Sequence, residues 1–167
     1  RDSEEEVEAL VRRFPRILLR TKRIWSKDSY PMHGLPFKFS SGEDPVQWNR
    51  RGAPFIPLLA RLGAQLNQFE DDERGGLLKK SVGSNCLQFI AGPFCDKGDH
   101  DQKLILLKQL REMNLLKKED IREYGLLGYA CWNNECFPKK RFNYLLEWDP
   151  GALAHPEAKG EIGRAHV

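Results

Sequence analysis

A short pattern that occurs three times constrains the fold of this chain more than any other feature of its sequence. Each copy is a turn followed by a brief apolar stretch that is rich in small residues. The copies lie at residues 30–35, 85–92 and 125–131. Pro31 suits the first position of a helix, because the N–H that proline lacks would have no helical partner there. We therefore expect each copy to open a short helix.

One position of this pattern differs between the copies. The first copy has His33, whose side chain can hydrogen-bond to a neighbouring repeat unit, that is, one copy of the pattern and the helix that follows it. The second copy has Gln88 at this position, and the third has Gly128. We interpret His33 as a structural hydrogen-bonding residue and not as a catalytic base. Where histidine is replaced, we expect the link between units to be weaker or differently made.

Four longer segments place apolar residues at helical spacing and are predicted to be the second helices of these units. They are residues 5–14, 55–66, 102–114 and 140–149. Gly63 is placed to end one of them, because glycine readily adopts the left-handed conformation that terminates helices. A Pro-x-x-Leu motif follows two of them, at Pro15–Leu18 and Pro150–Leu153, where the proline stops the helix and the leucine can pack under its last turn.

These motifs recur in the same order, which predicts an all-α fold of stacked antiparallel helix pairs. The short helices that the three copies open, here called openers, are expected to begin at Pro31, Cys86 and Leu126, which are 55 and 40 residues apart. The uneven spacing places extra length between the helices, chiefly in residues 36–53 and 68–84. Both segments are rich in glycine, serine and acidic residues, so we expect solvent-exposed loops there.

The openers resemble the Thr-Pro-Leu-His signature of ankyrin repeats, although an ankyrin repeat is about 33 residues long. Four segments together are similar to a group of degenerate ankyrin-repeat-like proteins predicted mainly from diatoms. These segments are residues 55–60, 74–78, 129–134 and 144–153. The resemblance implies a fragment of a helical-repeat solenoid over residues 1–153, with about three to four irregular repeats that belong to a longer array. It also implies protein–protein recognition through the repeat tips and the concave face.

Composition agrees with a folded chain that is one domain or one stretch of a repeat array. Of the 167 residues, 40% are hydrophobic and 31% are charged, and no apolar run is long enough to span a bilayer. The net charge of +3 is small, but seven basic residues and no acidic residue lie between Arg12 and Lys27. This cluster is either a solvated face or a patch that binds phosphate or acidic groups, so nucleic-acid or phosphoinositide binding is an alternative function.

The cysteines and the two ends of the chain bear on its location and boundaries. Cys86, Cys95, Cys131 and Cys136 form no Cys-x-x-Cys pair, which predicts buried, reduced thiols in an intracellular protein of the cytoplasm or nucleus. The chain begins without methionine, so a targeting signal upstream would not be seen. Residues 154–167 are expected to be a disordered tail, and residues 161–167 resemble a translated sequencing adapter.

The sequence predicts no catalytic, cofactor-binding or metal-binding residues. It has no Gly-x-Ser-x-Gly or His-Glu-x-x-His motif, which speaks against the usual hydrolases and metalloproteases. Arg74-Gly75-Gly76 lacks the spacing of a phosphate-binding loop and is predicted to be a tight turn. His100 lies among Asp96, Asp99 and Asp101, which we interpret as a polar loop between two helices.

The predicted function is therefore binding of a protein partner, without catalysis. Tryptophan and arginine are the residues most enriched at binding hot spots, and Trp132 is predicted near the turn between two helices. The predicted partner-binding residues are Trp132, Asn133, Asn134, Trp48, Asn49 and Arg50.

Overall fold

The computed structural model describes residues 3–24, 27–38, 47–81, 83–92, 100–132 and 137–154, and within them the chain is mostly helical, as predicted. The α-helices of this part are α1 (Glu4–Arg13), α2 (Pro31–Gly34), α3 (Ile56–Gln65), α4 (Cys86–Ala91), α5 (His100–Glu112), α6 (Lys118–Glu123), α7 (Leu126–Ala130) and α8 (Lys139–Trp148). The 3₁₀ helices are η1 (Pro15–Leu19), η2 (Ala53–Phe55), η3 (Asp71–Gly76) and η5 (Pro150–Ala154). The tail beyond residue 154, including the adapter-like segment, lies outside the described residues.

Three short helices begin where the recurring pattern predicts them. Helix α2 begins at Pro31, α4 at Cys86 and α7 at Leu126. Local signals explain two of these starts: Pro31 occupies the first helical position, and the Asn85 side chain accepts a hydrogen bond from the backbone N–H of Gln88. The longer helices α1, α3, α5 and α8 match the four predicted amphipathic segments to within about two residues at each end.

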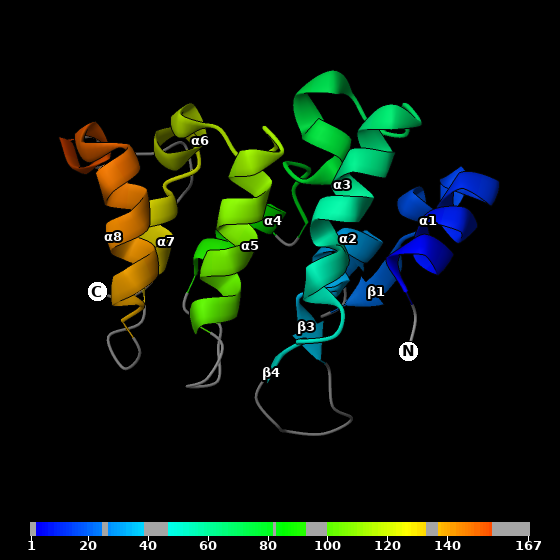
Figure 1. Cartoon of the computed structure of the whole chain (residues 1–167), viewed down its shortest axis with the longest axis horizontal. Helices are drawn as coiled ribbons and strands as arrows, with labels where there is room; N and C mark the ends of the chain where they lie inside the picture. Colours follow the sequence, from blue (N-terminus) through cyan, green and yellow to red (C-terminus); the bar gives the residue numbers. More distant parts are fainter. Residues whose placement is uncertain are drawn as a thin grey trace.

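The helices form two rows (Figure 1). The longer helices contact one another in chain order, α1 with α3, α3 with α5, and α5 with α8. Each short helix contacts the longer helix that follows it, and α4 also contacts α7 in the next pair. In Figure 1, α3, α5 and α8 all run from the lower edge to the upper edge, so these three helices are parallel to one another.

Side chains at the variable position of the pattern link successive pairs. Nε2–H of His33 donates to the carbonyl of Lys79, at 2.6 Å, and Nε2–H of Gln88 donates to the carbonyl of Tyr124, at 2.9 Å. Both acceptors lie shortly before the next short helix, so glutamine makes the same kind of link as histidine. The predicted structural role of His33 is confirmed, and Gly128 has no side chain with which to make this bond.

Ion pairs join the segments that follow the longer helices at the upper edge. Arg74 of η3 pairs with the buried carboxylate of Asp120 in α6. Arg122 of α6 in turn donates two hydrogen bonds of 2.5 Å to Asp149, directly after α8. These hydrogen bonds hold the pKa of the Asp149 carboxyl below its usual value. Bidentate arginine–carboxylate pairs fix orientation as well as distance, so this edge is held at two points.

The hydrophobic core is one cluster to which all the longer helices contribute. Val11, Leu62, Leu107 and Leu145 represent α1, α3, α5 and α8 in it. Leu18, after α1, is also buried, as the Pro-x-x-Leu motif predicts. The same prediction is wrong for Leu153, which is 60% exposed, because in η5 it is Ala152 that packs into the core.

Two short antiparallel strand pairs were not predicted. β1 (Lys22–Ile24) pairs with β2 (Lys27–Ser29), and β3 (Phe37–Lys38) pairs with β4 (Gln47–Trp48). The second pair lies where a solvent-exposed loop was expected. The cross-strand partners Phe37 and Trp48 are both buried, which shows that burial of aromatic rings accompanies this pairing.

The prediction that Gly63 ends the third helix is wrong. Gly63 is buried within α3, which continues to Gln65, and the left-handed residue after the helix is Asn67, with φ of 49°. Gly63 instead allows close contact, since a Cβ there would lie 2.5 Å from the carbonyl oxygen of Gly75. The predicted turn at Arg74-Gly75-Gly76 is confirmed, because all three residues have positive φ.

Candidate interaction surfaces

Trp132 lies directly after α7 and is 62% exposed, the largest value among the exposed large hydrophobic residues of the described part. Its ring packs edge-on against Tyr129, with centroids 5.6 Å apart, and the Tyr129 hydroxyl lies 3.0 Å from the Ser84 hydroxyl oxygen. The predicted position of Trp132 at the turn between helices is confirmed. Asn133 and Asn134, predicted as contacts beside it, lie outside the described residues.

The second predicted cluster is Trp48, Asn49 and Arg50, and its tryptophan, unlike Trp132, is buried. Trp48 is only 4% exposed, and the ammonium of Lys103 lies 4.6 Å from the centre of its ring. The prediction of Trp48 as a surface contact is therefore corrected, because packing against Lys103 and the core removes it from solvent. Asn49 is half-buried and accepts hydrogen bonds from the N–H groups of Arg51 and Gly52, which gives it a role in the turn. Arg50 is exposed.

The basic cluster that follows Glu8 is only partly available to a ligand. Arg12 pairs with Glu8 at 2.7 Å and also donates to Gln65, and the guanidinium of Arg13 lies over the Phe14 ring. Arg16 and Arg20 have no ion-pair partner among the residues that the structure describes. The side chains of Lys22, Arg23 and Lys27 lie outside that description.

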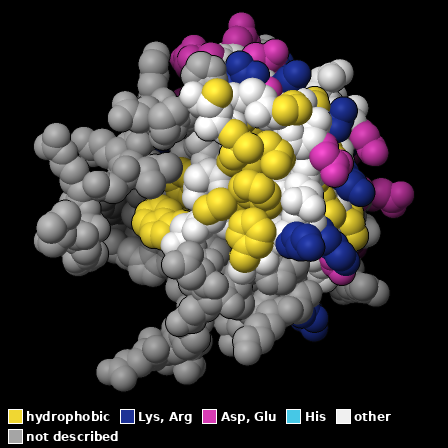
Figure 2. All heavy atoms as spheres, turned by 90° about the vertical axis from the view of Figure 1, so that its left-hand side faces the viewer, with side chains coloured by type: hydrophobic (Ala, Val, Ile, Leu, Met, Phe, Trp, Pro, Cys, Tyr) yellow, Lys and Arg dark blue, Asp and Glu magenta, His cyan; other side chains and the backbone are white. Residues whose placement is uncertain are grey.

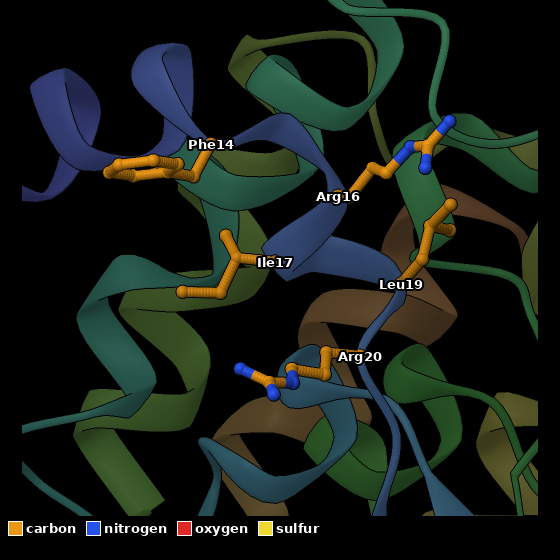
Figure 3. Close-up of a pocket in the computed structure, with 5 residues that line it drawn as sticks. All are labelled: Phe14, Arg16, Ile17, Leu19 and Arg20. Carbon is orange, nitrogen blue, oxygen red and sulfur yellow. The ribbon is translucent and has the colours of Figure 1, made fainter.

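A shallow pocket of about 610 Å³ lies on η1 (Figure 3). It is lined by Phe14, Arg16, Ile17, Leu19 and Arg20. Its volume lies within the range of small-ligand pockets, about 300–1,000 Å³, and most of its lining is hydrocarbon. Phe14 is the last residue of the segment 5–14, in which apolar residues recur at helical spacing, and the structure leaves it 54% exposed. The sequence signal that could have indicated this surface is the pair Leu10 and Phe14, which lie one helical turn apart and next to arginines.

Apolar side chains also form a band at the opposite end of the molecule (Figure 2), bordered along one side by charged groups. Phe137, shortly before α8, is 48% exposed, and its ring packs against Phe142 of α8, with centroids 5.2 Å apart. On the other side of α8, the Tyr144 and Trp148 rings face Arg111 of α5, with the Arg111 guanidinium 4.1 Å from the centre of the Trp148 ring. The inner side of α8 is therefore closed by its neighbour.

The thiols differ in accessibility. Cys86 is fully buried, and burial raises the pKa of its thiol to about 12. Cys131 is exposed, so the prediction of buried thiols is confirmed for Cys86 and wrong for Cys131. Cys131 lies at the end of α7, beside Trp132, where the chain turns towards solvent. Cys95 and Cys136 lie outside the described residues.

Buried His33 has the environment of a structural residue. Its Nδ1 has no hydrogen-bond partner among the described residues, while Nε2–H is held by the Lys79 carbonyl. Burial lowers the pKa of His33 below its usual value, so the ring is neutral at pH 7. Within the described ranges, no group of three or more His, Cys, Asp or Glu side chains could hold a metal ion.

Comparisons with protein families, with curated proteins and with solved structures found no match. No helix in the described part of the chain is long and apolar enough to cross a membrane.

Proposed function

We propose that this chain is a protein-interaction module built from ankyrin-like helix pairs, and that it binds a protein partner where α7 leads into α8. The observation that carries the proposal is the exposed ring of Trp132. Tryptophan combines a large apolar area with a polar N–H, which is why it is enriched at interface hot spots.

The surroundings of Trp132 favour binding further. Its ring rests on Tyr129, which is itself buried and hydrogen-bonded to Ser84. A side chain that is already held in place loses less conformational freedom when a partner covers it. Cys131, next to it, is also exposed.

The repeat interpretation is supported by the recurrence of one link. His33 and Gln88 occupy the same position of their short helices, and both donate to a backbone carbonyl that precedes the next short helix. Repeat proteins are stabilised by contacts between neighbouring units, and they present extended surfaces to partners. This recurrence supports α2–α3, α4–α5 and α7–α8 as the units of the proposed array.

The proposal is tested by affinity capture from an extract of the source organism, with the chain and its Trp132→Ala variant as baits. Captured proteins are compared by quantitative mass spectrometry, and the affinity of a recovered partner is then measured directly. We expect Trp132→Ala to weaken binding at least about 30-fold, which corresponds to about 2 kcal/mol. Its melting temperature should stay close to that of the parent chain, because truncation of an exposed ring leaves no buried cavity.

Two variants serve as controls. Ile105→Ala truncates another exposed apolar residue, 55% exposed on α5, and should leave partner binding unchanged. Leu145→Ala should cost about 2–5 kcal/mol of folding free energy, because Leu145 is fully buried. If Trp132→Ala destabilises the fold as much as Leu145→Ala, or if no protein distinguishes the Trp132 and Ile105 baits, the proposal is wrong.

Binding of nucleic acid or phosphoinositides is the second candidate function. The observation in its favour is that Arg16 and Arg20 line one pocket and have no ion-pair partner among the described residues. Arg12 and Arg13, by contrast, are engaged within the chain. Binding driven by phosphate groups weakens steeply as ionic strength rises, whereas binding through Trp132 should change little. A titration at several salt concentrations therefore separates the two functions.

A further inference from the structure

The surface of η1 is organised by the geometry of a 3₁₀ helix. Three residues make one turn of such a helix, so side chains three positions apart lie above one another. Phe14, Ile17 and Arg20 therefore form one row, and Arg16 and Leu19 form a second row, as Figure 3 shows. The inward side of η1 carries Leu18, which is buried in the core. Both outer rows place an arginine beside apolar side chains.

These rows present unusually exposed apolar groups for a core-forming segment. Phe14, Ile17 and Leu19 are 54%, 37% and 40% exposed, and Leu10 on the preceding helical turn is 48% exposed. Phe14, Ile17 and Leu19 line one pocket, so they form a shared apolar surface, and Leu10 lies one helical turn before Phe14. Contiguous apolar patches with a polar border are typical of binding sites.

The border of this surface is positively charged. Arg16 and Arg20 line the pocket itself, and Arg13 lies over the Phe14 ring at 5.5 Å from its centre. No acidic residue lines the pocket, and neither Arg16 nor Arg20 has an ion-pair partner within the described ranges. Among the described residues, no carboxylate therefore complements these two arginines.

We propose that this surface, formed by Leu10, Phe14, Ile17 and Leu19 with Arg16 and Arg20, binds an acidic amphipathic helix of a protein partner. Apolar side chains of that helix fill the pocket, and its flanking carboxylates pair with the two arginines. Helices that lay an apolar face into a groove are a recurring mode of peptide recognition. This site is separate from Trp132, and the inference does not depend on the function proposed for that residue.

Charge on the same helix argues against a broad anionic surface as the occupant. Glu4, Glu5 and Glu6 form the exposed first turn of α1, whose ten residues span only about 15 Å. A membrane or a nucleic acid that extended from Arg16 and Arg20 along α1 would bring phosphate groups towards these three carboxylates. A single narrow helix can reach the arginines without covering them.

The experiment uses the full chain and a fluorescent synthetic peptide of about 15 residues, near the length at which isolated helices become stable. Leucines three and four positions apart form one face of the peptide, and glutamates flank them. A second peptide has lysine in place of every glutamate. We expect the glutamate peptide to bind, with an affinity that decreases as salt is added, and the lysine peptide not to bind.

Variants of the chain locate the binding site. Arg16→Gln combined with Arg20→Gln should weaken binding of the glutamate peptide about 10-fold, as expected for the loss of two partly exposed charge pairs. Lys118→Gln combined with Lys139→Gln removes the same amount of charge from exposed positions elsewhere and should change the affinity less than twofold. Ile17→Ser tests the apolar contact independently and should also weaken binding. Circular dichroism of each variant checks that the helices are retained.

Other occupants give distinct results. Stronger binding of phosphatidylserine vesicles or of an oligonucleotide than of the glutamate peptide, abolished by the arginine double variant, would assign the surface to phosphate groups and overturn the inference. Dimerisation in sedimentation velocity that Ile17→Ser abolishes would assign it to a second copy of the chain and overturn it as well. Absence of glutamate-peptide binding, or equal binding to both double variants, would also refute it.

Discussion

Replacement of Gly75 by alanine tests how closely η3 packs on α3. Gly75 has φ of 65°, in the left-handed region, and a Cβ at this position would lie 1.8 Å from the carbonyl oxygen of Ala60. It would also lie 2.9 Å from the backbone nitrogen of Ala64. Both neighbouring atoms belong to the backbone of α3, which cannot move aside as a flexible side chain can.

The expected cost has two parts. For a residue with a Cβ, the left-handed conformation lowers the stability of the fold by about 1–2 kcal/mol. Overpacking of a well-packed interior costs about 1–3 kcal/mol, and a clash with helix backbone belongs at the upper end of that range. We therefore expect Gly75→Ala to lower the free energy of unfolding by roughly 4 kcal/mol, or the melting temperature by roughly 8–16 °C for a chain of this size.

Gly83→Ala is the matched control. Gly83 also has positive φ, 87°, but a Cβ there would meet no atom within 4 Å. Its substitution should cost only the backbone strain, about 1–2 kcal/mol. Urea unfolding followed by circular dichroism measures both variants. If Gly75→Ala is no more destabilising than Gly83→Ala, the inference that η3 packs closely on α3 is wrong.

Three further predictions follow from burial. Gly63→Ala should destabilise the chain in urea unfolding although alanine favours helices, because its Cβ would lie 2.5 Å from the Gly75 carbonyl oxygen; a gain in stability would contradict this packing. Because burial lowers the pKa of His33, the unfolded chain binds more protons than the folded chain just below pH about 6.5. The free energy of unfolding should therefore decrease as pH is lowered from about 6.5, by at most about 1.4 kcal/mol per pH unit. His33→Gln, patterned on Gln88, should remove that slope in unfolding measured across this pH range, and an unchanged slope would exclude His33 as its source. Iodoacetamide followed by peptide mapping should label Cys131 in the native chain and Cys86 only after unfolding, since the Cys86 thiol has a pKa of about 12; equal labelling rates would contradict its burial.

The positions of the helices could be predicted from sequence because their signals are local. Pro31 opens α2, the Asn85 cap opens α4, and apolar spacing of 3.6 residues defines the longer helices. These features depend only on residues within one or two helical turns of each other. Local signals also identified the turn after α3 and the exposed position of Trp132 at the end of α7.

Predictions that depended on distant neighbours were less successful. Trp48 was predicted to be an exposed contact because polar residues follow it, but Lys103, far along the chain, packs over its ring. Phe14 fits the apolar spacing of the first helical segment, but Val11 is the buried residue of α1 and Phe14 is left exposed. The candidate site on η1 therefore escaped prediction, since exposure of an apolar residue depends on which other elements cover it.

The sequence by itself determined that the chain is mostly helical, where its short and long helices begin, and which side chains of the recurring pattern can form hydrogen bonds. Backbone hydrogen bonding, capping and helical periodicity act over a few residues, so a single sequence contains that information. Only the tertiary structure decided that Gly63 and Gly75 allow two backbones to touch, that Trp48 is buried and that Phe14 is exposed. These outcomes depend on contacts between residues far apart in the chain, and such contacts exist only once the helices have packed.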